Sequence, residues 1–510
     1  MEDKQLKLGS LLSYLQMGVS IVIGLLYTPF MLNVLGKNEY GLYSTITSTM
    51  GLLNILTVGF NSAYMFYYAK QDKEDDSNLK KINGMFLIVL TFLGVVALFL
   101  GLFISNNLEL FFSDGLTASE YKLAKKLSLL LIISLSVSFP LSVFNNMVIA
   151  HERFVFAKLI NIIRTIISPS FSFVLLLLGY KSIALVLVTV IVTFCIDSTF
   201  CFYAIFKLKQ RFDFRNLSKG DILGIFKYTV YIAIHFIVDQ INWNIDKLLL
   251  GRFKGTEVVA IYSVAFTLFQ YYSTFSAPVS SVFIPRIHLI VKNYEEDTVK
   301  RNILLTNLFI KVGNVQFVIL SLLLLGIVFF GKHFIGYWAG SGYDDSYYIL
   351  LLLAIPATVD LIQNLGIEIQ RALNTHKFRA FLYLITAVLN FIISIFLAQK
   401  YGAIGCAIGT AVSYIITQGV LMNVYYHKKC GINIVLFWKS ILRLCFGLII
   451  PSMFGIIFNI FIIFDSVIKL LITIILFTII YIISIYLLGL NKEKREAVKK
   501  FVREFITRGK

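Results

Sequence analysis

Long apolar segments recur along the whole chain and constrain its fold more than any other feature. Blocks of about twenty or more apolar residues follow one another from Gly9 onward, and a helix needs about twenty such residues to cross a bilayer. Hydrophobic residues make up 58% of the 510 residues and charged residues only 15%, so no segment is polar for long enough to form a soluble domain. The sequence predicts an all-α integral membrane protein.

The apolar blocks predict about fourteen transmembrane helices. Because that number is even, both termini lie on one side. If this side is the cytoplasm, the cytoplasmic loops and tails hold roughly thirty Lys and Arg, against about eleven on the other side, as positive-inside topology requires. We therefore expect a multi-pass protein of the cytoplasmic (inner) cell membrane with cytoplasmic termini. The spans begin near residues 9, 40, 83, 123, 158, 181, 223, 256, 302, 343, 380, 402, 438 and 466.

Two short segments of the first half reappear in the second half. LGKNEYGLYS (35–44) aligns with KGTEVVAIYS (254–263), and GYKSIAL (179–185) aligns with KYGAIGC (400–406) at nearly the same offset. Each pair occupies the same place in a six-span unit, which predicts two parallel six-helix halves. The expected domains are a first bundle (1–218), a second bundle (219–432), an extra helix pair (433–490) and a basic amphipathic cytoplasmic tail (491–510).

Span seven contains polar residues where lipid cannot solvate them, in VDQINWNIDKLLLG (238–251). Asp239, Asn242 and Asp246 recur at i, i+3 and i+7, so they share one helix face, and Lys247 follows them. An ionisable group at membrane depth costs several kcal/mol, so this face must meet a cavity or another helix. It is a candidate cation or proton site, or a wall of a hydrated cavity. For Asp246 and Lys247, solvation at the outer interface is the alternative.

Other spans also carry polar groups that suit a central cavity. Arg164, with Asn161 one turn away, is a candidate for holding an anionic head group, and so is Lys311, since arginine binds phosphate in a bidentate manner and lysine as a point charge. Snorkelling of Arg164 and Lys311 to the cytoplasmic face is the alternative. Asp360 is a candidate cation ligand or part of a helix-packing cluster. Further polar residues in these spans are Asp197, Asn314, Gln316, Gln363, Asn364 and Glu368.

The sequence lacks the signatures of soluble enzymes. It contains no Walker A sequence, no G-x-G-x-x-G, no H-E-x-x-H and no G-x-S-x-G. The five cysteines form no CxxC pair, and the basic residues lie between apolar blocks without a nucleic-acid-reading motif. We expect no catalytic residues, no metal, no cofactor and no nucleic-acid partner, hence a protein that is not an enzyme.

GKNEYGLYS after span one, together with IDKLLLG and VAIYSVA after span seven, resembles the polysaccharide transporters, or Wzx-type oligosaccharide-lipid flippases, of the multidrug/oligosaccharidyl-lipid/polysaccharide exporter superfamily. The resemblance implies a V-shaped pair of six-helix bundles around a central cavity, with the last two spans outside. It also implies alternating access for a polyprenyl-pyrophosphate-linked oligosaccharide, used in surface polysaccharide biosynthesis. Membrane lipids and other polysaccharide-assembly proteins are the implied partners.

In that interpretation, basic groups meet the diphosphate and acidic or amide groups couple transport to H+ or Na+. The expected substrate-binding residues are Arg164, Lys311, Lys247 and Asn161, and the ion-coupling candidates are Asp239, Asp246, Asn242 and Asp360.

One departure from the related peptidoglycan-precursor flippases bears on the substrate. Those flippases resemble this chain in having fourteen spans but carry arginines in the first two, where this chain has Gln16, Asn33, Asn54 and Asn61. Surface polysaccharide is therefore favoured over lipid II. The alternatives are a cation-coupled multidrug exporter of the same fold, a membrane-embedded polymerase or glycosyltransferase acting on lipid-linked sugars, and a scaffold protein, which would not need intramembrane charges.

Overall fold

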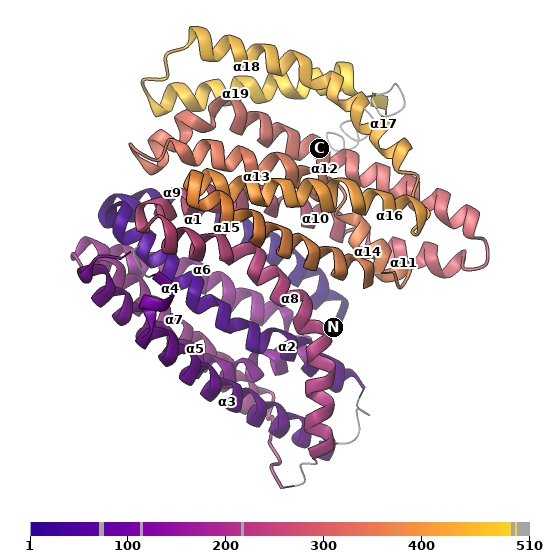
Figure 1. Cartoon of the computed structure of the whole chain (residues 1–510). Coiled ribbons are helices and arrows are strands. Elements are labelled where there is room, and N and C mark those ends of the chain that lie inside the picture. Colours follow the sequence, from indigo (N-terminus) through magenta and orange to yellow (C-terminus); the bar gives the residue numbers. More distant parts are fainter. Residues whose placement is uncertain are drawn as a thin grey trace, which may run out of the picture. The chain divides into compact units, whose positions relative to one another are not determined.

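The computed structural model describes residues 2–70, 76–112, 116–215, 219–375, 377–490 and 495–496. Within these ranges every regular element is helical (Figure 1). The α-helices are α1 (Glu2–Gly51), α2 (Ile55–Ala69), α3 (Asp76–Asn106), α4 (Leu108–Phe112), α5 (Ala118–Ala150), α6 (Phe154–Leu177), α7 (Lys181–Phe202), α8 (Lys219–Phe253), α9 (Thr256–Thr274), α10 (Ser276–Ser281), α11 (Ile284–Asn293), α12 (Thr298–Ala339), α13 (Asp345–Ile362), α14 (Leu365–Ala372), α15 (Lys377–Tyr414), α16 (Met422–Lys428), α17 (Ile434–Cys445), α18 (Ile449–Phe461) and α19 (Val467–Ser484).

Eleven helical segments of the described chain are long and apolar enough to cross a membrane. Two of these, Leu12–Ala69 and Lys377–Lys428, are 58 and 52 residues long, about twice the length of one span. Each is broken near a glycine with positive φ, Gly36 (φ 70°) and Gly402 (φ 58°). Counting each as two spans and adding the 35-residue α8 brings the crossings to the predicted number of about fourteen, which confirms the all-helical membrane fold.

The chain packs into two compact units. One contains Met1–Ser263 with Ala387–Gly409, and the other contains Val264–Thr386 with Thr410–Lys510. These boundaries follow packing and differ from those of the expected six-helix halves, so the division at residues 218 and 432 stays a prediction. The expected amphipathic tail lies outside the described residues, apart from Arg495 and Glu496.

In the first unit, α3 packs on α5, α5 on α7, α7 on α6, and α6 on α1. Apolar side chains fill the interior of this bundle, and Tyr64, Phe86, Val143 and Met147 are among those fully buried. In the second unit, α18 and α19 pack on each other and on α12. There Tyr481 of α19 donates a hydrogen bond of 2.7 Å to the Val318 carbonyl, and its hydroxyl lies 2.7 Å from Ser321 Oγ. The outward faces of both units are rich in exposed leucine, isoleucine and phenylalanine, as lipid contact requires.

Candidate functional site

The two pairs of repeated segments each share a positive φ at one matched position. Gly36 and Gly255, which the repeat aligns, both have positive φ, 70° and 82°. The second pair of segments aligns Lys181 with Gly402, and both again have positive φ, 20° and 58°. Only glycine enters this region without steric cost, so the aligned glycines Gly36 and Gly255 mark similar breaks in the helices of both halves.

The repeated segments 35–44 and 254–263 contact each other inside the first unit. Ser44 of α1 and Ser263 of α9 are aligned by the repeat, and their Oγ atoms form a hydrogen bond of 2.7 Å. Three residues earlier, Gly41 lies so close to α9 that a Cβ would collide with the Thr256 carbonyl and come within 3.2 Å of the Ala260 nitrogen. The helices after the two turns therefore cross through small residues.

Acidic side chains fix the position of both turns. Glu39 Oε1 accepts hydrogen bonds from the Ser182 nitrogen (2.9 Å) and hydroxyl (2.6 Å), and so caps the start of α7. Lys181 Nζ lies 3.5 Å from the other Glu39 oxygen. Thr256, at the start of α9, donates a hydrogen bond of 2.8 Å to Glu120 Oε1. A carboxylate at a helix N-terminus is favoured by the helix dipole and by the free backbone N–H groups.

Of the two acids on the span-seven face, Asp246 is the one whose side chain the structure describes, and this side chain is buried. Asp246 is 1% exposed, and its Oδ2 accepts a hydrogen bond of 2.7 Å from the hydroxyl of Tyr262, which is itself buried. The alternative of a solvated Asp246 is therefore excluded, whereas Lys247 is half-buried. The backbone of Asp239 and Asn242 lies in α8, but their side chains are outside the described part of the chain. Their predicted role as ion ligands stays a prediction.

Arg164 points to a neighbouring helix within the first unit. Its Nη2 donates a hydrogen bond to Thr193 Oγ1 of α7, one turn before Asp197 of the same helix. Both Arg164 and Asn161 are half-buried. Arg164 is thus anchored to α7, ten residues, or about 15 Å along the helix, from the start of α6.

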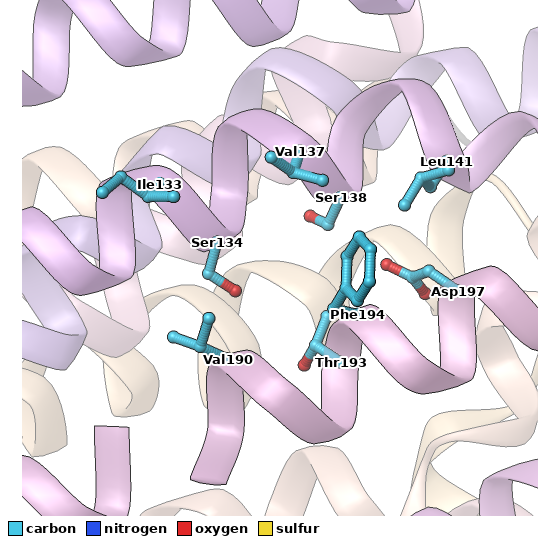
Figure 2. A pocket seen from close by; sticks show the side chains of 9 residues that line it. All are labelled: Ile133, Ser134, Val137, Ser138, Leu141, Val190, Thr193, Phe194 and Asp197. Carbon is cyan, nitrogen blue, oxygen red and sulfur yellow. The ribbon is translucent and has the colours of Figure 1, made fainter. Parts of the chain in front are cut away.

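Asp197 and Thr193 line a crevice of about 260 Å³ between α5 and α7. Figure 2 shows the oxygens of Ser134, Ser138 and Asp197 directed into the space between the two helices. The remaining walls are apolar, and Ile133, Val137 and Phe194 at the rim are exposed. A carboxylate in such surroundings is costly to keep charged, and Arg164 of the neighbouring α6 is bonded to Thr193, one turn from Asp197.

The polar groups of span nine divide into one exposed cation and two packing residues. Lys311 is exposed on α12. Asn314 exchanges hydrogen bonds of 2.9 and 3.0 Å with Ser440 of α17. Gln316 donates to the hydroxyls of Ser276 (3.1 Å) and Ser280 (2.7 Å). Asn314 and Gln316 therefore join helices within the second unit, as interhelical hydrogen bonds do in membrane proteins.

Asp360 forms an ion pair that the sequence analysis missed. Arg379 Nη2 of α15 lies 2.9 Å from Asp360 Oδ1, and Arg379 also donates to the hydroxyls of Tyr426 (2.8 Å) and Tyr383 (3.1 Å). Arg379 is only 5% exposed. In the sequence Arg379 ends the basic segment RALNTHKFR (371–379), which is typical of a cytoplasmic loop, but the apolar residues directly after it are a signal that it begins a span.

The neighbours of Asp360 contribute to helix packing. Gln363 donates to Asn423 Oδ1 at 2.8 Å, and Asn364 donates to Ser276 Oγ at 3.2 Å. Among the described residues, no group of three or more His, Cys, Asp or Glu side chains is arranged to hold a metal ion. The candidate residues therefore fall into the two units: Arg164, Asn161, Asp246 and Lys247 in the first, and Lys311 and Asp360 in the second.

Comparison with known proteins identifies the family. The profile of a family described as "Polysaccharide biosynthesis protein" matches residues 9–291, more than half of the sequence. The chain belongs to this family. This confirms the sequence-based resemblance to the polysaccharide transporters of the superfamily named above.

Two relatives show how far the similarity extends, one over most of its length and one over less than half of its length. A putative O-antigen transporter from Shigella flexneri is 20% identical over 417 residues, which cover 79% of this chain and 93% of the relative. A probable low-salt glycan biosynthesis flippase, Agl15, from Haloferax volcanii is 24% identical over 197 residues, 38% of this chain and 39% of that one.

A solved structure shares the fold. The lipid II flippase MurJ, in an inward closed conformation, superimposes with a TM-score of 0.72 at 18% identity, covering 94% of this chain and 97% of MurJ. At this identity the likeness concerns the fold.

Proposed function

We propose that the protein is a flippase that moves a polyprenyl-pyrophosphate-linked oligosaccharide across the cytoplasmic membrane by alternating access, for surface polysaccharide biosynthesis. The observation that carries the proposal is the family match over residues 9–291 in a chain built from membrane-spanning helices. The names of the O-antigen transporter and the glycan flippase, and the fold shared with a lipid II flippase, support it. Lipid II itself is not favoured, because Gln16, Asn33, Asn54 and Asn61 supply no cation in the first two spans.

The contacts of the basic residues support a role in holding the diphosphate. Arg164 donates a hydrogen bond to Thr193 of α7, which snorkelling to the membrane surface would break. Lys311 is exposed on α12, so its ammonium is accessible to a ligand. We assign the diphosphate to Arg164, Lys311 and Lys247, together with Asn161, which lies one turn from Arg164 in the sequence, because charge-assisted hydrogen bonds to phosphate are among the strongest in proteins.

Coupling to H+ or Na+ would use acids that lipid does not solvate. Asp246 is the best supported by its burial and its bond to Tyr262. Asp239 and Asn242 belong to the same helix face. Asp360 is the least favoured of the four, because Arg379 already neutralises it.

Flipping in proteoliposomes tests the proposal. A fluorescent polyprenyl-diphosphate oligosaccharide is reconstituted with the protein, and an outer-leaflet quencher reports its movement. We expect Arg164→Ala and Lys311→Ala to slow flipping at least tenfold, the size expected for a lost charge-assisted hydrogen bond. Arg286→Ala, which removes an exposed cation from α11, is the matched control and should flip like the wild type.

The same assay separates the competing functions. Asp239→Asn should abolish any dependence of flipping on an ion gradient while leaving gradient-free flipping in place. If the wild type leaves the lipid unmoved with and without H+ and Na+ gradients but exports organic cations, the multidrug-exporter alternative replaces the flippase.

A further inference from the structure

The contact between the two repeated turns joins equivalent residues of the two halves. Ser44 is aligned with Ser263, and the same offset aligns Gly41 with Ala260. The two serines are hydrogen-bonded at 2.7 Å, and Gly41 packs against the backbone of α9 beside Ala260. The two repeats therefore contact each other through residues that are equivalent in the alignment.

The crossing is tightly closed. Ser44 is 6% and Ser263 1% exposed, and Ala260 is fully buried. The absence of a side chain at Gly41 allows the backbones to touch, as in the close helix crossings that small residues permit in membranes. Glu120 holds the start of α9 against this crossing through Thr256. No sugar-sized group fits between two helices in backbone contact.

The contact that these four small residues themselves make is weak. One hydrogen bond between neutral hydroxyls contributes about 0.5–1.5 kcal/mol, and glycine, alanine and serine bury little apolar surface. Large interdigitated side chains such as leucine would each contribute about 1.5–3 kcal/mol on burial and would hold the helices together more firmly. Small residues thus allow the helices to come close while adding little free energy that would have to be overcome to separate them.

We propose that Gly41 and Ser44, crossing Ala260 and Ser263, form a latch that closes the transport pathway at the end of the molecule where the repeated turns lie, and that the latch must open once in every transport cycle. These four are positioning residues, and the substrate need not touch them. The inference rests on the proposed function, since a pathway that closes and opens is needed for alternating access. It goes beyond that function by naming the residues that close one end.

A reversible cross-link tests whether the latch must open. Ser44→Cys and Ser263→Cys are combined in a protein whose five native cysteines are replaced by alanine. We expect oxidation to form a disulfide and to reduce flipping more than tenfold, and reduction to restore it. Each single-cysteine variant, oxidised in the same way, should keep its flipping rate. A protein that flips equally well when fully cross-linked would overturn the proposal, because the crossing would then be a pivot rather than a latch.

A second variant tests the latch without any lipid substrate. Gly41→Ala places a methyl group against the Thr256 carbonyl, so it should force the helices apart. The reaction of a cysteine at position 263 with a membrane-impermeant maleimide should then accelerate at least tenfold. Gly51→Ala is the matched control, because a Cβ at this position in the same helix meets no atom within 4 Å. Equal labelling of both variants would overturn the latch.

The two experiments also separate failure of the latch from failure of the proposed function. If neither the reduced double-cysteine protein nor the wild type moves the lipid, the flippase assignment fails. The labelling of position 263 still decides whether the crossing opens.

Discussion

The Arg379 guanidinium is among the most enclosed charges of the second unit, and its partners explain why it is tolerated there. Asp360 neutralises it, while Tyr426 and Tyr383 accept two further hydrogen bonds from it. Removing one member of a buried ion pair leaves an uncompensated charge and costs about 3 kcal/mol. We expect Asp360→Ala to lower the free energy of unfolding by about this amount, measured by denaturation in detergent micelles.

An exposed ion pair provides the control for this prediction. Asp465 and Lys469 are 2.7 Å apart, and the hydrogen bond from Lys469 lowers the pKa of Asp465, yet both side chains are largely in solvent. Asp465→Ala should leave the unfolding transition unchanged, because exposed pairs contribute little. The double variant Asp360→Leu with Arg379→Met should recover stability, since apolar residues can replace a buried pair. If the double variant is as unstable as Asp360→Ala, the loss of stability comes from lost packing and not from the unpaired charge of Arg379.

At single positions, sequence reasoning found intramembrane charges but could not find their partners. Polarity within an apolar block marks Arg164, Asp246 and Asp360, because lipid cannot solvate them. Their neighbours Thr193, Tyr262 and Arg379 are brought close only by helix packing. For Asp246 the sequence left burial and solvation open, because depth in a bilayer cannot be read from residue order near a span's end.

At the scale of helices, the two kinks at glycine turn long helical segments into pairs of spans. Gly36 has φ 70° and ψ 173°, a conformation that is essentially restricted to glycine. We expect Gly36→Ala to cost about 1–3 kcal/mol of stability through backbone strain alone, because a Cβ there meets no atom within 4 Å. Thermal unfolding in detergent measures the loss.

The matched control for Gly36→Ala lies in the same helix. Gly18 is α-helical and its Cβ would also meet nothing within 4 Å, so Gly18→Ala should be neutral or slightly stabilising. Equal effects at both positions would contradict the strain argument. The apolar blocks predicted the spans around these kinks, and the repeat predicted that the turns are alike. That the turns touch each other could not be predicted, since a repeat gives equivalence but no distance.

For the molecule as a whole, the distribution of basic residues predicts the topology. The predicted cytoplasmic segments are 207–221, 286–301, 371–379 and 425–431, and Lys and Arg in short loops remain on the cytoplasmic side. In a cysteine-free protein in intact cells, Asn293→Cys should react with an impermeant maleimide only after permeabilisation. Gly342→Cys, in the turn between α12 and α13, should react without it. The reverse labelling pattern would contradict cytoplasmic termini.

The charge of the proposed substrate leads to a prediction about energetics. A diphosphate-linked lipid is a net anion, and an inside-negative potential favours its outward movement by about 2.3 kcal/mol per charge for each 100 mV, roughly a fifty-fold shift of the equilibrium per charge. In proteoliposomes, a potassium-diffusion potential that is negative in the lumen should enrich the fluorescent lipid in the outer leaflet, whichever way the protein is inserted. A polyprenyl-linked glycan without phosphate, if carried, should distribute equally with and without the potential. If the distribution of the charged lipid also does not depend on the potential, cations must move with the lipid and cancel its charge. The intramembrane acids of α8, with Asp246 foremost, would then be the residues that carry these cations.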